Sequence, residues 1–225
     1  MSINTMTDWL SHNSNLLLGA AWETIYMVTV AGIIGFAIGI PLGVILHISK
    51  KGGLLENPRL NTILGAIVNI GRSVPFLVLM VAIIPVTKIL VGTFIGTTAA
   101  IVPLTIGAIP FVARLIEGAL LEVPAGLVEA AQSMGATPTQ IITKVLLPEA
   151  LPTILNSVTI TMVTLVSYSA MAGTVGGGGL GDVAIRYGFH RYDIAVMAVT
   201  VVMLIVLVQI IQSIGDALVR RFDHR

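Results

Sequence analysis

Long hydrophobic segments alternate with shorter polar stretches along the 225 residues of this chain. An α-helix needs about 20 mostly apolar residues to cross the hydrocarbon core of a bilayer. The pattern therefore predicts an all-α integral membrane protein whose helices form one transmembrane domain over residues 1–225. On that length scale five spans are expected, over residues 24–48, 63–86, 99–119, 152–171 and 193–218.

The composition supports this prediction. Hydrophobic residues make up 56% of the chain and charged residues only 10%, whereas a soluble domain has about 25% charged residues. The 12 basic and 11 acidic residues nearly cancel, so we expect membrane lipid and no nucleic acid as a partner. Cysteine is absent, which excludes disulfides, thiolate metal ligands and cysteine nucleophiles.

Basic residues between the predicted spans indicate the orientation, because cytoplasmic loops of membrane proteins are rich in Lys and Arg. Five spans place the two termini on opposite sides. An outer N-terminus and a cytoplasmic C-terminus leave only Lys88, Arg186 and Arg191 outside. The cytoplasm then receives Lys50, Lys51, Arg59, Lys144, Arg220, Arg221 and Arg225.

Glycines in the first predicted span recur every four residues, at Gly35, Gly39 and Gly43. Residues four apart share a helix face, and a face without side chains lets a second helix approach closely. We expect close packing here, although glycine is also simply common in membrane helices. Prolines inside the spans should kink their helices, and these are Pro41, Pro75, Pro103 and Pro110.

Hydroxyl groups follow one face of the fourth predicted span. The residues on this face are Ser157, Thr161, Thr164, Tyr168 and Met171, spaced four, three, four and three apart. One hypothesis is that they line a hydrated translocation path. The alternative is that the hydroxyls bond back to their own helix or hold a helix pair together.

Charged residues also lie within or near the predicted spans, at Arg72, Arg114 and Glu117. Charged groups inside a membrane usually pair or face an interior cavity. Alternatively, these three lie close enough to the cytoplasmic surface for their charged ends to reach water.

The polar insert over residues 121–151 carries two short helix patterns. Pro124 suits the first turn of the first helix, and Gly135 should end it. Its apolar side is expected to consist of Leu127, Val128, Ala131 and Met134.

The second helix should begin after Thr137, which can act as its N-cap, with Pro138 in the first turn. Gln140, three residues after Thr137, would complete a capping box. We expect a short cytoplasmic hairpin, for which a plain interfacial connector is the alternative. Its apolar residues are Ile141, Ile142, Val145 and Leu146.

Fixed positions across this hairpin resemble the EAA loop of bacterial ABC importer permeases, which has the pattern E-A-A-x3-G-x9-I-x-L-P. The pattern is matched by Glu129, Ala130, Ala131, Gly135, Leu147 and Pro148, and Val145 stands at the isoleucine position. The resemblance implies that these are the coupling positions and that the helix before Gly135 docks on a separate ATPase subunit. ATP and Mg²⁺ would bind to that partner, so no cofactor is expected in this chain.

Longer segments extend the resemblance over nearly the whole chain. "NIGRSVPFLVLMVAIIPVTKILVGT" and "VSYSAMAGTVGGGGLGD", with the five predicted spans, are similar to the permeases of methionine importers. The resemblance implies import of D- or L-methionine across the bacterial inner membrane. It also implies a homodimer, two ATPase subunits and a periplasmic methionine-binding lipoprotein that delivers the cargo.

The glycine-rich stretch before the last span would lie outside the membrane. Glycine permits unusual backbone torsions and close backbone approach, so a flexible outer gate or a contact for a binding protein is expected. Candidate contacts with that partner are Asp182, Arg186, His190 and Arg191. An ordinary solvated loop is the alternative.

Several other functions lack support in the sequence. No G-x4-G-K-[ST] phosphate-binding loop occurs, and the histidines show no metal-ligand spacing, so we expect neither a metal site nor an enzyme. A carrier driven by an ion gradient usually has internal repeats and a carboxylate in mid-span, and neither is evident. The EAA pattern leaves another amino acid or a small peptide open as the cargo.

Overall fold

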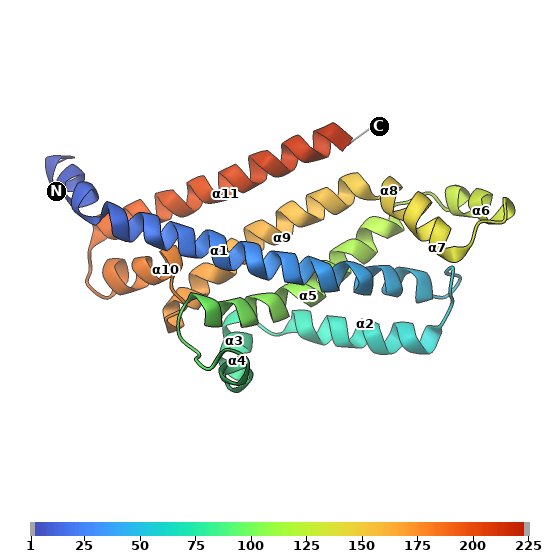
Figure 1. Ribbon diagram of the computed structural model, residues 1–225, viewed down its shortest axis with the longest axis horizontal. Helices are drawn as coiled ribbons and strands as arrows, with labels where there is room; N and C mark the ends of the chain where they lie inside the picture. The colour runs from blue at the N-terminus through green and yellow to red at the C-terminus, as the bar shows by residue number, and fades with distance from the viewer. Residues whose placement is uncertain (1–2, 223–225) are drawn as a thin grey trace. The chain divides into compact units, whose positions relative to one another are not determined.

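The structure is a computed structural model that describes residues 3–222, with side chains from Ser14 onward, and all regular structure in that range is helical (Figure 1). Four of these helices are long and apolar enough to cross a membrane. They are α1 (Ile3–Ser49), α5 (Thr97–Leu121), α9 (Leu151–Ala172) and α11 (Ile194–Phe222). The all-α membrane fold predicted from the sequence is confirmed.

The second expected span, over 63–86, is not one helix. α2 (Pro58–Ser73) ends before Val74, whose backbone is extended (φ −83°, ψ 123°), and α3 (Phe76–Ala82) begins after Pro75. Proline lacks an N–H group and disfavours the helical conformation of the residue before it. The two helices therefore count as a span only as a broken pair.

The other prolines do not interrupt their helices. Pro41 lies inside α1, and Pro103 and Pro110 lie inside α5, and both helices continue through them. α4 (Ile84–Val91) follows α3 and has Pro85 in its first turn. The N–H groups of a first turn have no acceptor within the helix, so proline removes no helical hydrogen bond there. Of the four prolines considered above, only Pro75 lies at a break between two helices.

Backbone contacts divide the chain into two compact units. Unit 1 comprises residues up to 33, residues 75–106 and residues 162–211. Its short elements are α3, α4, the 3₁₀ turn η2 (Gly173–Val175), α10 (Gly179–Val183) and the π-helical turn η3 (Ala184–Phe189). A core of six buried side chains joins α1, α10 and α11, and consists of Leu17, Ala20, Leu180, Val183, Val196 and Val199.

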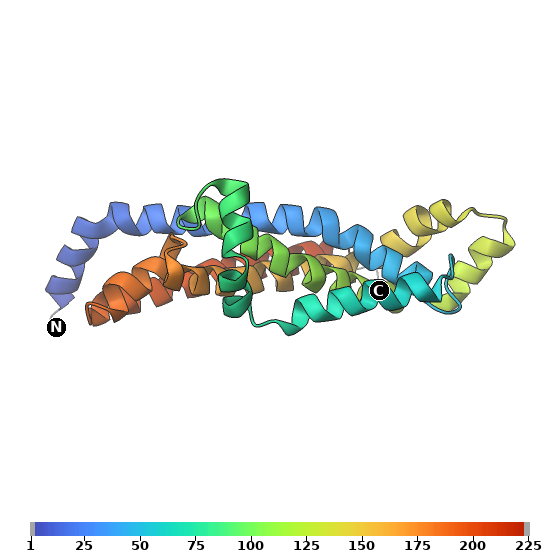
Figure 2. The same ribbon diagram turned by 90° about the horizontal axis from the view of Figure 1, so that it is seen from below.

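Unit 2 comprises residues 34–74, residues 107–161 and residues from 212 onward. It contains α2, α6 (Ala125–Ser133), α7 (Pro138–Ile141), the π-helical turn η1 (Ile142–Leu146) and α8 (Leu147–Glu149). Figure 2 shows α6 and α7 as two short helices joined by a loop. This pair is the hairpin that the sequence predicts over residues 121–151.

The glycine repeat of α1 packs closely against another helix, as predicted, and that helix is α5. A Cβ atom on Gly35 would lie 2.9 Å from the Cβ of Ala108, and one on Gly39 would lie 2.6 Å from Cγ1 of Val112. On Gly43 it would lie 2.6 Å from the carbonyl oxygen of Ala113. Such distances leave no room for a side chain, so all three glycines are needed for this helix contact.

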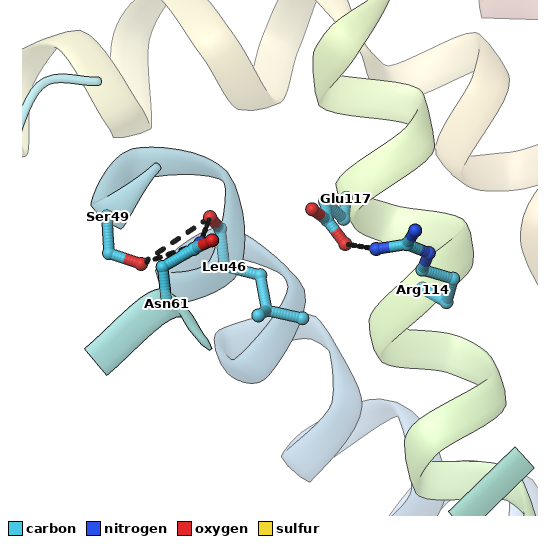
Figure 3. A network of polar contacts seen from close by, with 5 residues as sticks. All are labelled: Leu46, Ser49, Asn61, Arg114 and Glu117. Carbon is cyan, nitrogen blue, oxygen red and sulfur yellow. Dashed lines mark hydrogen bonds and ion pairs between the residues drawn. The ribbon is translucent and has the colours of Figure 1, made fainter. Parts of the chain in front are cut away.

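Polar groups fasten the end of α1 to α2 in unit 2 (Figure 3). The amide of Asn61 donates hydrogen bonds to the carbonyl of Leu46 (2.7 Å) and to the hydroxyl of Ser49 (3.2 Å). The side chain of Asn57 caps α2 by accepting from the N–H of Leu60. This end of α1 is therefore held by side-chain hydrogen bonds as well as by packing.

The charged residues near the spans divide into two cases. Arg114 and Glu117 form an ion pair of 2.7 Å one turn apart on α5, as charged groups in a membrane are expected to do (Figure 3). The side chain of Arg114 is half-exposed, whereas that of Glu117 is largely covered. Arg72 lies exposed in the last turn of α2, where a positive charge interacts favourably with the helix dipole.

Candidate coupling hairpin and associated sites

The first helix of the hairpin ends in a glycine-dependent turn. Gly135 has φ of +77°, a region that residues with a Cβ rarely adopt. Its N–H donates to the carbonyl of Gln132 (2.9 Å), and the N–H of Ala136 donates to that of Ala131 (3.1 Å). This pair of bonds is the Schellman arrangement that closes helix ends. The predicted stop at Gly135 is confirmed, and torsion rather than crowding requires the glycine, because a Cβ there would meet nothing within 4 Å.

The second helix begins with the predicted capping box. The Thr137 hydroxyl accepts from the N–H of Gln140 (3.4 Å), and the side-chain oxygen of Gln140 accepts from the N–H of Thr137 (2.8 Å). Two N–H groups that the helix itself leaves unpaired are thereby satisfied. With an ordered end on each side, the loop between α6 and α7 is short and fixed.

The inner side of the hairpin is part of the core of unit 2. Ala131, Ile141 and Leu146 are almost completely buried and pack in one cluster with Ile48 of α1 and Leu120 of α5. The EAA-pattern residues Val145 and Leu147 are partly buried against the same cluster, and Pro148 is exposed in α8. The hairpin is therefore packed firmly onto the helices of its unit.

The outer side of α6 is apolar and exposed. Leu127 is 42% and Met134 81% exposed, and Ala130, between them, is exposed as well. Their spacing of three and four residues places them on one helix face, which we call the α6 outer face. The expectation that Leu127 and Met134 share a side with Ala131 and Val128 was wrong, since those two face inward and α6 is apolar on both sides.

A cavity of about 310 Å³ lies behind α6 in unit 2. The ends of α1 and α5 and the turn after α1 form its other walls. Its polar lining comes from His47, Lys50, Glu129 and Gln132. Glu129, the first residue of the EAA pattern, is exposed and lines this cavity rather than belonging to the apolar α6 outer face.

The residues of the expected translocation path have different environments within their two units. In unit 2, Ser157 and Thr161 are buried, and their hydroxyls donate to the carbonyls of Thr153 (2.8 Å) and Ser157 (2.7 Å). These two hydroxyls therefore bond back to their own helix. In unit 1, Thr164 is half-buried, and the ring of Tyr168 stacks on Phe76 with a centroid distance of 4.3 Å.

Met171, the last residue of that stripe, is 42% exposed. It lines an open apolar groove of about 590 Å³ between α9 and α11 in unit 1, together with Leu204 and Val208. The assignment of the stripe to a translocation path stays a prediction.

The expected contacts for a binding protein lie together on one short stretch of unit 1. Asp182 and Arg186 form an ion pair of 3.0 Å. The guanidinium of Arg191 lies 4.7 Å from the centre of the Tyr187 ring, and His190 is exposed beside Phe189. The stretch thus presents charged and aromatic groups, but its partner stays a prediction.

Two residues that sequence reasoning missed hold this stretch in place. The carboxylate of Glu23 accepts from the N–H of Gly179 (2.7 Å), and the hydroxyl of Thr24 accepts from the N–H of Leu180 (2.9 Å). Both therefore satisfy the first N–H groups of α10. A signal was present in the sequence, because Glu23 is an acidic residue at the start of a hydrophobic segment, where charge is costly.

Among the side chains that the structure describes, from Ser14 to Phe222, no group of three or more His, Asp or Glu could hold a metal ion. The described residues form a capped hairpin with an apolar outer face, apolar helices of bilayer-spanning length, and a surface with charged and aromatic groups on segment 182–191.

Comparison with known proteins identifies the family. Residues 39–225 match the family of binding-protein-dependent transport system inner membrane components. The chain belongs to this family, and it is a transporter membrane subunit rather than an enzyme. An ion-driven carrier, considered as an alternative above, is thereby set aside.

Individual relatives are similar over the whole length of the chain or nearly so. The chain is 84% identical, over all 225 residues of both proteins, to the probable D-methionine transport system permease protein MetI of Vibrio cholerae serotype O1. It is 53% identical to the protein of that name from Pasteurella multocida, over 90% of this chain and 94% of that protein. A solved structure, described as an inward-facing conformation of the MetNI methionine ABC transporter, matches with a TM-score of 0.92 and 51% identity over 100% of both chains.

Proposed function

We propose that this chain is the permease subunit of an ATP-driven importer that moves methionine, in its D-form, its L-form or both, into the cytoplasm. The observation that carries the proposal is the packed hairpin with its exposed α6 outer face. Full-length similarity to proteins named for D-methionine transport supports the choice of cargo.

The hairpin would transmit the closure of an ATPase to the membrane helices. The α6 outer face would enter a cleft of the ATPase, and large apolar side chains such as Met134 supply binding energy when they fill a pocket on a partner. Ala131, Leu147 and Gly135 would act indirectly, by packing the hairpin onto unit 2 and closing its turn. Because the hairpin is packed on α1 and α5, a pull on α6 would move these helices as a body.

The assembly would contain two copies of this chain and two ATPase subunits. ATP and Mg²⁺ would bind to the ATPase, and no cofactor would bind to this chain. A methionine-binding lipoprotein would contact Asp182, Arg186, His190 and Arg191, and lipid would cover exposed apolar side chains of α11 such as Ile205 and Ile210.

The proposed orientation places the N-terminus outside and the C-terminus in the cytoplasm. Within unit 2 lie the basic loop residues expected on the cytoplasmic side, Lys50, Lys51, Arg59, Lys144, Arg220 and Arg221. Arg225, also counted for that side, lies outside the described residues. Unit 1 holds Lys88, Arg186 and Arg191, which would face the periplasm. With unit 2 on the cytoplasmic side, this distribution would follow the positive-inside rule.

Uptake of labelled methionine tests the proposal. Cells that lack this chain would be compared with the same cells carrying it on a plasmid, with unlabelled amino acids and small peptides as competitors. We expect restored uptake that only methionine and close analogues reduce. Restored uptake of another amino acid would keep the importer and change its cargo, whereas no uptake from a complex that hydrolyses ATP would contradict the proposal.

A further inference from the structure

Unit 1 contains a partly open cavity of about 200 Å³ beside its interrupted helices. α3, α4, the first turns of α5 and the end of α9 with the glycines after it form the walls. Among the described residues that line it, Thr87 alone has a polar side chain, and Thr87 is almost completely buried. The rest of the lining is apolar and includes Met80, Val81, Phe94, Ala100 and Val175.

The backbone around this cavity is irregular where a membrane helix would be regular. α4 ends at Gly92 in a left-handed conformation (φ +83°), and the N–H of Gly96 donates to the carbonyl of Gly176 (2.9 Å). Irregular backbone at membrane depth is tolerated where it is buried in protein or lines a cavity. In transporters, interrupted helices of this kind often form the substrate site.

The size and lining of the cavity favour one small apolar group. A volume of 200 Å³ corresponds to about seven water molecules at roughly 30 Å³ each. The methylthioethyl group of methionine, with four heavy atoms, fits this space. A charged group would lose its hydration without gaining an ionic partner, so the ammonium and carboxylate of an amino acid would stay outside. Phe94 adds an aromatic ring, with which a thioether sulfur interacts favourably.

The cavity adjoins the stripe that we expect to line the translocation path. The ring of Phe76 stacks on Tyr168 of that stripe, with planes 5° apart. Met80 follows Phe76 by one turn on the same face of α3 and lines the cavity. Both side chains are buried. The cavity therefore lies about one helical turn from a path residue.

From these observations we infer that the cavity binds the thioether side chain of methionine during transport. The inference deepens the proposed function and rests on it. Transient binding of the side chain here would let the permease itself discriminate among amino acids, in addition to any binding protein. A lipid acyl chain is the competing occupant, and the test below separates the two.

Photolabelling of the assembled transporter tests this inference. The purified complex of permease and ATPase in nanodiscs would be irradiated with a methionine analogue that carries a diazirine in place of the thioether, and labelled peptides would be mapped by mass spectrometry. We expect label on peptides that contain Met80, Phe94 or Ala100, and its loss with excess unlabelled methionine. Label elsewhere, or label that methionine does not displace, would overturn the inference, and the second result would point to lipid-like binding.

A filled cavity gives the second measurement. Ala100→Leu places a larger side chain in the lining, whereas the matched control Thr98→Leu changes an exposed residue in the same turn of α5. One methylene in an apolar pocket changes discrimination by about 10–200-fold, so we expect Ala100→Leu to reduce methionine-protected label at least about tenfold and Thr98→Leu to leave it unchanged. Equal labelling of both would overturn the inference.

Methionine uptake by proteoliposomes containing the wild-type complex and its binding protein would be measured in parallel. Uptake without displaceable cavity label would overturn the cavity assignment alone. Absence of methionine uptake by a complex that hydrolyses ATP would overturn the proposed function and the inference with it. If Ala100→Leu fails to fold, the wild-type label map still decides.

Discussion

The hairpin over residues 121–151 and the segment over residues 172–192 both connect long membrane helices, but they are held in opposite ways. The hairpin is anchored by apolar side chains of its inner side, such as Ile141 and Leu146, and keeps an exposed apolar face outside. The 172–192 segment is anchored through its own backbone, by Glu23 and Thr24 of α1 and by close contacts at its glycines. The first arrangement leaves an exposed apolar surface, to which we propose that the ATPase binds, whereas the second ties the loop to α1 by hydrogen bonds.

The largest effect is expected where the 172–192 segment packs closely against the backbone of α9. A Cβ on Gly181 would lie 2.5 Å from both the Cα and the carbonyl oxygen of Ala170. Because backbone rather than a movable side chain blocks the space, Gly181→Val should destabilise the protein by about 3 kcal/mol or more. Thermal unfolding in detergent would measure the change.

The matched control for this substitution is Gly126→Ala in the hairpin. A Cβ on Gly126 would meet nothing within 4 Å, and alanine is favoured over glycine inside a helix. We expect no loss of stability there. Equal behaviour of the two variants would contradict the view that the segments are held differently.

A second prediction concerns the polar anchor. Glu23→Ala removes the acceptor for the N–H of Gly179, and loss of a hydrogen bond to a charged group costs about 1.5–3 kcal/mol. Glu23→Gln keeps an acceptor oxygen and should retain more of the stability. Hydrogen exchange at Gly179 and Leu180 would report the loosening directly. Unchanged exchange in Glu23→Ala would show that the bond does not hold the segment.

The turn of the hairpin gives a smaller effect. Gly135→Ala forces a side chain into a left-handed torsion, at a cost of about 1–2 kcal/mol, whereas Gly135→Asn should be tolerated better because asparagine adopts this region more readily. We expect methionine uptake to fall more in the alanine variant, with both proteins inserted in the membrane. Uptake that ranks in the opposite order would indicate that space, not torsion, limits this position.

Local signals in the sequence predicted the hairpin well. The capping box at Thr137 and Gln140 and the glycine stop at Gly135 depend on neighbours within a few residues, so their patterns are visible along the chain. The sequence predicted that the α1 glycines contact another helix, but it did not predict that this helix is α5. The spacing of the glycines identifies only the face of α1 that makes the contact.

Other features were out of reach for physical reasons. The bonds from segment 172–192 to Glu23 and Thr24 join groups 156 residues apart, and no local pattern encodes such pairs. The break after Val74 was expected only as a kink at Pro75, because sequence alone does not decide whether neighbours restore the helix. The outward direction of Leu127 and Met134 was missed because both sides of α6 are apolar, and periodicity cannot then tell the core side from the partner side.

The most direct test of the account compares charge placed on the α6 outer face with charge placed elsewhere on the hairpin. Met134→Asp would be set beside Thr139→Asp, which adds the same charge at an exposed position near the start of α7. Methionine uptake and copurification of the ATPase would be measured at equal membrane abundance. Removing a central interface contact costs about 2 kcal/mol or more of binding free energy. We therefore expect the ATPase to associate at least about tenfold more weakly with the Met134→Asp variant, and we expect little change with Thr139→Asp. Normal association and uptake in the Met134→Asp variant would contradict the claim that this face couples the permease to its ATPase.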